Sequence, residues 1–158
     1  MPRKLITLCF FYCAIVYTAY SQVAFDHLSV PQGLSQSTVL SIIKDSRGFM
    51  WFGTRDCLNK YDGQSIKTYK SSSNTSSISS NDYIYSLFED RQKNFWIGTQ
   101  SGLNRYLPET DAFERILNDP NDANSISGNS VTSIFQDSSE LLWFGTTYGL
   151  NLLDSPSS

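Results

Sequence analysis

Three stretches of the chain, "WFGTRDCLNKYD" (51–62), "WIGTQSGLNRYL" (96–107) and "WFGTTYGLNLLD" (143–154), are near-copies of one another. Each follows an apolar-rich segment that ends in an Asp six positions before the Trp. The period of 45–47 residues indicates stacked copies of one supersecondary unit, and repeats of roughly 40–50 residues are typical of β-propeller blades. This repeat decides the fold class.

Within each copy the residue pattern is that of β-strands. "VLSIIKD" (39–45) and "FMWFGT" (49–54) are short runs of β-branched and aromatic residues separated by polar breakers. No long window keeps a helical period. Each copy therefore predicts up to four antiparallel strands, the content of one propeller blade. The predicted strands are 38–44, 49–54, 58–62 and 65–70, then 83–89, 94–99, 103–107 and 112–117, then 130–136, 141–146 and 150–154.

The third copy lacks a fourth strand, and the N-terminal region supplies a spare one. "AFDHLSV" (24–30) resembles "AFERILN" (112–118), the predicted outer strand of the second copy. A closed propeller needs about four to eight blades, so the chain is not expected to close alone. We predict an all-β fold: an incomplete β-propeller of about three four-stranded antiparallel blades, the third without its outer strand, plus a displaced N-terminal outer strand. The predicted divisions are 1–21, a signal peptide; 22–37, the N-terminal outer strand and a linker; 38–78, the first blade; 79–125, the second blade; and 126–158, a partial third blade.

The first 21 residues have the pattern of a secretory signal peptide. Arg3 and Lys4 precede an apolar run over 5–17, and small residues at positions 19 and 21 favour cleavage before Gln22. The run is shorter than the roughly 20 apolar residues that span a membrane, although an uncleaved anchor is an alternative. We expect an exported, periplasmic protein.

Charge and cysteine content exclude several functions. Without Arg3 and Lys4, 10 basic residues face 15 acidic ones, which gives a net charge near −5 and argues against binding of nucleic acid. Cys57 is the single cysteine beyond the signal peptide, so an internal disulfide is not expected. With one His in the chain, we predict no metal site and no cofactor.

The invariant positions of the repeat are predicted to be structural. The Trp residues would fill the seams between blades, the Gly residues mark close backbone approach, and the Thr residues form local hydrogen bonds. The Asp residues would cap turns by accepting backbone N–H groups. Sugar stacking by Trp and catalysis by Asp are the alternatives, but no pair of carboxylates stands out and no catalytic residue is predicted. These positions are Trp51, Trp96 and Trp143; Gly53, Gly98 and Gly145; Thr54, Thr99 and Thr146; and Asp45, Asp90 and Asp137.

Two positions depart from the repeat. Cys57 stands where the other copies have Gly102 and Gly149, which are expected at positive φ; a left-handed Cys57 would cost about 1 kcal/mol. A thiol that pairs between chains is the alternative role for Cys57. Lys93 and Glu140 stand where the first copy has Gly48.

Ligand recognition is expected where the copies differ. Because strands alternate in direction, the loops before the first strand and between the second and third strands open on the same end of the blades. Variable polar and aromatic residues there suit a neutral polar ligand such as a glycan. The predicted ligand-binding residues are Arg55, Gln100, Tyr148, Asn81 and Asn129.

The segment "FDHLSVPQGLSQSTVLSIIKDSRGFMWFGTRDCLNKYDGQSIKTY" (25–69) resembles the opening of two-component regulator propeller sensors. These are periplasmic domains of hybrid sensor histidine kinases of Bacteroidetes. The resemblance implies a truncated N-terminal fragment of a sensor that recognises oligosaccharides, without the kinase domains and so without enzymatic activity. It implies contact with a membrane only through missing C-terminal segments.

The functional expectation is therefore a non-catalytic ligand-sensing module with an oligosaccharide as its ligand. A fragment of a propeller-based carbohydrate-active enzyme is one alternative. The other is a protein-interaction scaffold that uses open blade edges, through self-association or through further propeller blades.

Overall fold

The computed structural model describes residues 23–70 and 83–153, in which eleven strands form three antiparallel sheets. The predicted all-β propeller fold is confirmed, and the strand ends agree with the sequence prediction to within one residue. The predicted signal peptide at 1–21 and the linker 71–82 lie outside the described residues. Blade 1 contains β1 (Val39–Lys44), β2 (Met50–Thr54), β3 (Leu58–Tyr61) and β4 (Ile66–Tyr69); blade 2 contains β5 (Ile84–Glu89), β6 (Phe95–Thr99), β7 (Gly102–Leu107) and β8 (Ala112–Ile116); blade 3 contains β9 (Val131–Gln136), β10 (Leu142–Thr146) and β11 (Gly149–Leu153).

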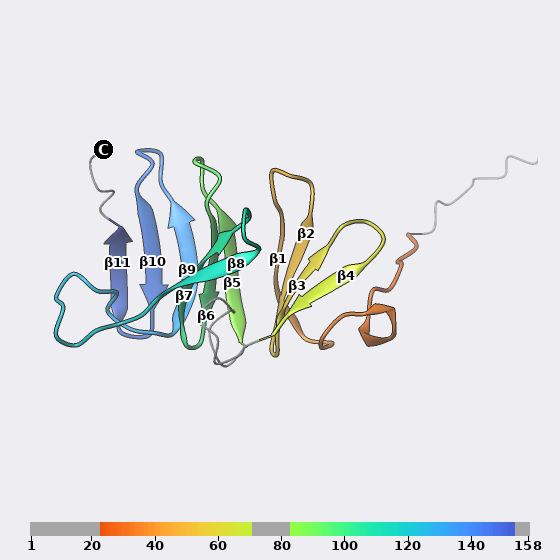
Figure 1. The fold of residues 1–158 in the computed structure, drawn as a ribbon, viewed down its shortest axis with the longest axis horizontal. Coiled ribbons are helices and arrows are strands. Elements are labelled where there is room, and N and C mark those ends of the chain that lie inside the picture. The colour runs from red at the N-terminus through yellow and green to blue at the C-terminus, as the bar shows by residue number, and fades with distance from the viewer. Residues whose placement is uncertain (1–22, 71–82, 154–158) are drawn as a thin grey trace, which may run out of the picture.

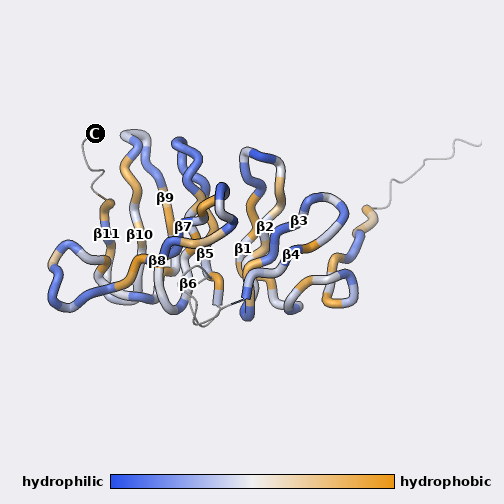
Figure 2. Tube along the Cα trace, in the orientation of Figure 1, coloured by the Kyte–Doolittle hydropathy of each residue, from blue (hydrophilic) through white to orange (hydrophobic). Residues whose placement is uncertain are grey.

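The three blades stand in a row, each a meander in which consecutive strands pair (Figure 1). The first strand of blade 2, β5, packs against β1 on one side and against β9 on the other, and later strands lie progressively outward. In every blade the turn between the first and second strands is at one end of the strands (top in Figure 1), and the turn between the second and third strands is at the other end (bottom). Hydrophilic residues concentrate in these turns and hydrophobic residues in the strands (Figure 2).

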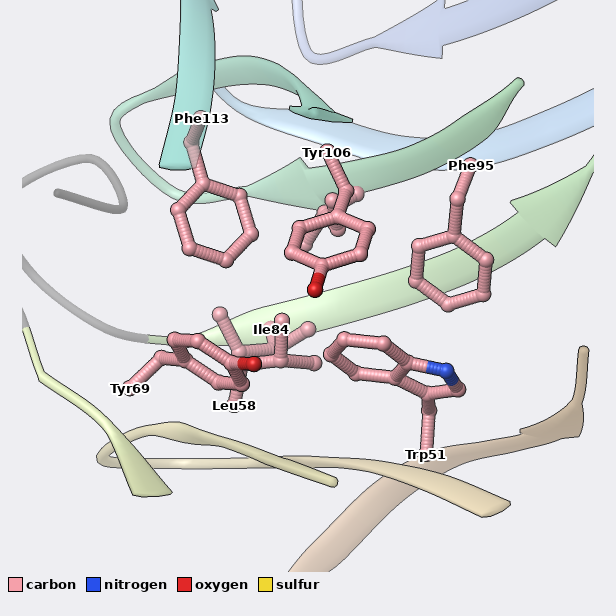
Figure 3. Close-up of a cluster of buried hydrophobic side chains, with 8 residues drawn as sticks. Trp51, Leu58, Tyr69, Ile84, Phe95, Tyr106 and Phe113 are labelled. Carbon is pink, nitrogen blue, oxygen red and sulfur yellow. The ribbon is translucent and has the colours of Figure 1, made fainter. Parts of the chain in front are cut away.

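The seam between blades 1 and 2 holds an aromatic cluster (Figure 3). The fully buried Trp51 ring has its centroid 4.7 Å from that of Phe95 and 5.1 Å from that of Tyr106. Aromatic pairs in this geometry contribute beyond the area that they bury. The buried members of the cluster are Trp51, Leu58 and Tyr69 from blade 1 and Ile84, Phe95, Ile97, Tyr106 and Phe113 from blade 2.

The seam between blades 2 and 3 repeats this arrangement with fewer aromatic residues. Trp96 packs edge-on against Phe144 with 5.4 Å between ring centroids. The same buried cluster includes the aliphatic residues Leu103 and Val131. The third tryptophan, Trp143, is only half-buried, because no described residue covers the far side of blade 3. On that blade Phe135 and Leu150 are 61% and 68% exposed.

The repeated glycine of the second strand lies where backbones come closest. A Cβ added to Gly53 would lie 2.3 Å from Ser41 Oγ and 2.6 Å from Ile84 Cγ2. The same addition at Gly98 would lie 2.7 Å from the carbonyl oxygen of Val131. Real Cβ atoms do not approach other atoms this closely. Glycine at this position therefore allows the second strand of one blade to pack closely against the first strand of the next blade.

The predicted strand at 24–30 is not formed. Residues 23–29 pair with no strand, Phe25 is 78% exposed, and Val30–Gln32 form a 3₁₀ turn. The fourth, outer strand of a blade pairs with the third strand of that blade. The third strand without such a partner is β11 of blade 3, which lies at the opposite end of the row from residues 23–29. Without that neighbour, the segment has no ladder of hydrogen bonds to hold it.

The expected strain at Cys57 is also absent. Gly102 and Gly149 do adopt positive φ, 146° and 134°, but among the described non-glycine residues positive φ belongs to Lys93, Asp111 and Glu140. The β2–β3 ladder ends at the Gly53–Leu58 pair, one pair earlier than the β6–β7 ladder, so the longer turn needs no left-handed residue at its end. Backbone strain occurs instead at Lys93 and Glu140, which have φ values of 70° and 68°. Both residues occupy the repeat position of Gly48, whose φ is also positive.

Candidate functional site

A hydrogen bond joins the repeated Asp and Trp in every blade. Trp Nε1 donates to Asp Oδ2 in the pairs Trp51–Asp45 (2.9 Å), Trp96–Asp90 (2.8 Å) and Trp143–Asp137 (2.9 Å). The other carboxylate oxygen accepts backbone N–H groups of the following turn, such as that of Phe49 at 2.9 Å. The sequence interpretation assigned separate roles to the two residues, although their constant six-residue spacing was the signal of this contact.

Two of these carboxylates, those of Asp45 and Asp137, have a pKa below the usual value and are held in the ionised form. Burial alone would raise the pKa of Asp45, but hydrogen bonds from Trp51, the Phe49 N–H and Arg47 outweigh it and hold the pKa below 3.8. At Asp137 the hydrogen bond from Trp143 has the largest influence and also lowers the pKa. A carboxylate that stays ionised and accepts an indole N–H is a poor general acid, which argues for a structural role.

The Asn of the third strand fixes the loop that enters its own blade. Asn59 Oδ1 accepts the Ser35 N–H at 3.0 Å, and its Nδ2 donates to Ser35 Oγ at 2.8 Å. In blade 3, Asn151 Oδ1 accepts the Ser127 N–H at 2.8 Å. The repeat "L-N" shows this residue in the sequence, but its role was not predicted, because its partner lies 24 residues away.

Four of the predicted ligand-binding residues, Arg55, Gln100, Asn129 and Tyr148, lie at the turn end that carries the second-to-third strand loops, which we call the ligand face. On this face each blade ties its two loops together by a backbone hydrogen bond. The bonds are Arg55 N to Thr38 O (3.3 Å), Gln100 N to Tyr83 O (3.1 Å) and Thr147 N to Ser130 O (3.1 Å). The loops are therefore braced rather than free, which suits recognition by exposed side chains.

Two groups of residues are brought together on the ligand face. The first comprises Arg55, Tyr83 and Gln100: the guanidinium carbon of Arg55 is 5.8 Å from the Tyr83 ring centroid, and Gln100 bonds to the Tyr83 carbonyl. Tyr83, which also lies 6.1 Å from the ring of Tyr85, was not among the predicted binding residues.

The second group is in blade 3. Tyr148 is 80% exposed and its ring lies against Gly128, where an added Cβ would be 2.7 Å from Tyr148 Cδ2. The exposed Asn129 next to it accepts the Asn118 N–H at 2.8 Å through Oδ1. The remaining predicted residue, Asn81, lies outside the described residues.

A groove of about 540 Å³ lies between blades 2 and 3 and is bordered by the loop residues 123–126. Its lining includes Leu103, Ile116 and Phe144. Ile116 occupies the register position of Tyr69, which contacts Phe113 in the first seam at 5.2 Å between centroids. The described part of blade 3 has no fourth strand, so no side chain there contacts Ile116 as Phe113 contacts Tyr69. The groove is thus explained by packing, without a ligand.

A smaller cavity of about 160 Å³ lies at the opposite turn end and is lined by Phe49, Lys60 and Lys67 among others. Lys60 Nζ is 4.0 Å from the Phe49 ring centroid and 5.4 Å from that of Tyr106. Burial, and then the charge of Arg47, lower the pKa of Lys60. Cation–π contact with the seam aromatics accounts for this placement.

Asp111 links the outer parts of blades 1 and 2. Its Oδ1 accepts the hydroxyls of Tyr69 and Tyr106, both at 2.6 Å, and its Oδ2 accepts Lys67 Nζ. Burial opposes ionisation, but the hydrogen bonds from Lys67 and the two tyrosines lower the pKa of Asp111 to about 2. Burial, together with these contacts, raises the pKa of Tyr69, so its hydroxyl stays a donor.

This contact predicts a pH dependence of stability. Because the pKa of Asp111 falls from 3.8 to about 2 on folding, its stabilisation is complete above pH 4 and is lost between about pH 4 and pH 2. Asp111→Asn, which tolerates the positive φ of this position, should lose less stability than the wild type between pH 6 and pH 3 in urea denaturation. Equal losses would contradict the assignment.

In residues 23–70 and 83–153, no group of three or more His, Cys, Asp or Glu side chains is arranged to hold a metal ion. Within the same residues, no helix is long and apolar enough to cross a membrane.

Comparison with known proteins identifies the repeat. Residues 33–56, 77–101 and 125–148 match the family described as "Two component regulator propeller". A 50-residue segment is 46% identical to Histidine kinase P4 of Formosa agariphila and covers 32% of this chain and 4% of that protein.

Two solved structures are similar over most of the chain. One is the extracellular domain of a protein described as a hybrid two-component system from B. thetaiotaomicron, with 38% identity, a TM-score of 0.75, and coverage of 82% of this chain and 19% of that one. The other, from the same organism, is described as a one-component system and has 26% identity, a TM-score of 0.68, and coverage of 83% and 18%. The chain thus spans less than a fifth of the length of these relatives.

Proposed function

Since the chain is made of repeats that belong to the two-component regulator propeller family, we propose that it is a non-catalytic ligand-sensing module of an exported two-component receptor. The similar structures are extracellular domains, and residues 1–21 would serve as the signal peptide. Chemistry on the ligand would then be unnecessary, because the signal would pass to other parts of the receptor. The observation that carries the proposal is the match of all three repeats to one sensor family.

The ligand face supports a neutral oligosaccharide as the ligand. Tyr148 exposes an aromatic surface of the kind on which sugar rings pack, while Arg55 and Gln100 offer hydrogen-bond donors beside Tyr83. The acidic chain would repel polyanionic polymers. Because the bracing bonds are made by backbone atoms, these side chains are free to differ between repeats without loss of the fold.

Binding of oligosaccharides to the purified chain, measured by calorimetry across a set of neutral glycans, tests the proposal. For the glycan that binds best, Tyr148→Ala and Arg55→Ala should each raise Kd about tenfold, the effect of losing one good contact. The exposed Lys70→Ala is the control and should leave Kd unchanged.

Two results would contradict the proposal. Unchanged affinity in both ligand-face variants would place the ligand elsewhere on the molecule. Release of shorter sugars during prolonged incubation would show turnover, and the non-catalytic assignment would be wrong.

A further inference from the structure

Neighbouring blades are joined at the Asp turns by a contact that occurs once per seam. The Ser46 N–H, one residue after Asp45, donates to Glu89 Oε2 of the next blade at 2.8 Å, and Ser46 Oγ donates to Glu89 Oε1 at 2.8 Å. In the second seam the Arg91 N–H, one residue after Asp90, donates to Gln136 Oε1 at 2.9 Å. The first free N–H of each turn is thus bound by the last residue of the next blade's first strand.

The two acceptors occupy the same register position. Glu89 pairs with Phe95 and Gln136 pairs with Leu142, each directly before the turn Asp. The corresponding residue of blade 1 is Lys44, which pairs with Met50. An ammonium group donates hydrogen bonds and cannot accept one. Blade 1 therefore lacks the side-chain oxygen with which blades 2 and 3 accept the turn N–H of the preceding blade.

The corresponding donor of blade 3 is unoccupied. Ser138 follows Asp137, is exposed, and has no acceptor for its N–H within the described part of the chain. The same side of the molecule exposes Phe135 and Leu150, at the end of the row away from the N-terminal segment. Blades 1 and 2 each present apolar side chains and a turn N–H donor to the next blade, and blade 3 exposes the same two features.

We propose that the open face of blade 3 docks a propeller blade whose first strand ends in Glu or Gln, and that Lys44 prevents blade 1 of a second copy from taking that place. In such a self-contact, the Lys44 ammonium of one copy would meet the Ser138 N–H of the other, two donors with like partial charge. A blade with Glu or Gln at this position would supply the missing acceptor. This contact forms at the seam between blades and involves no residue of the ligand face.

The substitution Lys44→Gln turns blade 1 into such a partner and tests the proposal by sedimentation equilibrium. The variant should self-associate with a Kd at least about tenfold lower than that of the wild type, because one hydrogen bond is gained and a donor–donor contact is removed. Lys70→Gln makes the same change of charge at an exposed site in the same blade and should leave the Kd unchanged.

A second substitution identifies the surface that is used. Ser138→Pro removes the N–H at a turn position that favours proline, so the turn should form as before. Combined with Lys44→Gln, it should return the Kd to the wild-type value; Leu150→Asp, which disrupts the apolar face itself, should do the same. The proposal is overturned if Lys44→Gln associates no more tightly than the wild type, or if neither second substitution reverses the gain.

Discussion

Replacing Trp51 with alanine is expected to lower the free energy of unfolding by about 3–5 kcal/mol, the range for a large aromatic removed from a packed core. The side chain is fully buried and its ring contacts Tyr69 of blade 1 and Phe95 and Tyr106 of blade 2. Its loss would leave a cavity between two sheets that cannot collapse easily, because each is fixed by its own ladder of hydrogen bonds. Urea denaturation followed by far-UV circular dichroism measures the change.

Trp143→Ala is the matched control, because it removes the same residue from the same position of the repeat. The Trp143 ring is half-buried and faces the open side of blade 3, so the expected loss is about 1–2 kcal/mol. Losses of equal size in the two variants would show that the seam contributes little to stability, and that each Trp acts within its own blade.

Asp45→Ala is expected to destabilise the chain by about 2–4 kcal/mol, because it removes the acceptor from buried donors. The carboxylate is 3% exposed and accepts Trp51 Nε1, the Phe49 N–H and the Arg47 guanidinium. An unsatisfied buried indole N–H cannot recover its hydrogen bond from water. The free energy of unfolding from urea titration at pH 7 gives the magnitude.

Asp137→Ala removes the equivalent carboxylate in blade 3, where it also bonds to an indole N–H and to turn N–H groups. These donors are reached by water, so the loss is expected to be clearly smaller than that of Asp45→Ala. The difference between Asp45→Ala and Asp137→Ala measures the effect of burial on one conserved geometry within the same chain. A larger loss for Asp137→Ala would refute this explanation.

The fold could be predicted from the sequence because its information is local and repeated. The strands follow from short β-branched and aromatic runs, and the period of the Trp residues places one blade after another. Three copies of one pattern reinforce each other, so an ambiguous strand in one copy can be read from the others. The same redundancy explains why strand ends agree so closely.

The errors arose where the outcome depends on a neighbour. The segment 24–30 has the composition of an outer strand, but it lacks the third strand that would pair with it. Cys57 was expected to adopt the backbone of Gly102, but its hairpin ends one pair earlier. Composition reports a residue's preference, and neither the register of a hairpin nor the presence of a partner can be read from it.

Contacts between blades were not predicted for a related reason. The bond from Ser46 to Glu89 joins residues 43 positions apart, and the acceptor changes to Gln136 in the next seam. On the ligand face, the loops of Arg55, Gln100 and Tyr148 are placed by strand alternation, whereas the contact of Arg55 with Tyr83 depends on how two blades pack. The binding role of these residues stays a prediction.

The seam contacts at the Asp turns also bear on how such a protein can evolve. Each turn donor is bound by a residue one repeat further along, at Glu89 and Gln136, so every repeat with an acceptor fits behind any other. Duplication or loss of a repeat by unequal recombination would then change the number of blades and keep this hydrogen bond at each junction. A repeat whose first strand ends in Lys44 lacks the acceptor, so its transfer to a place behind another blade would remove this hydrogen bond from the junction.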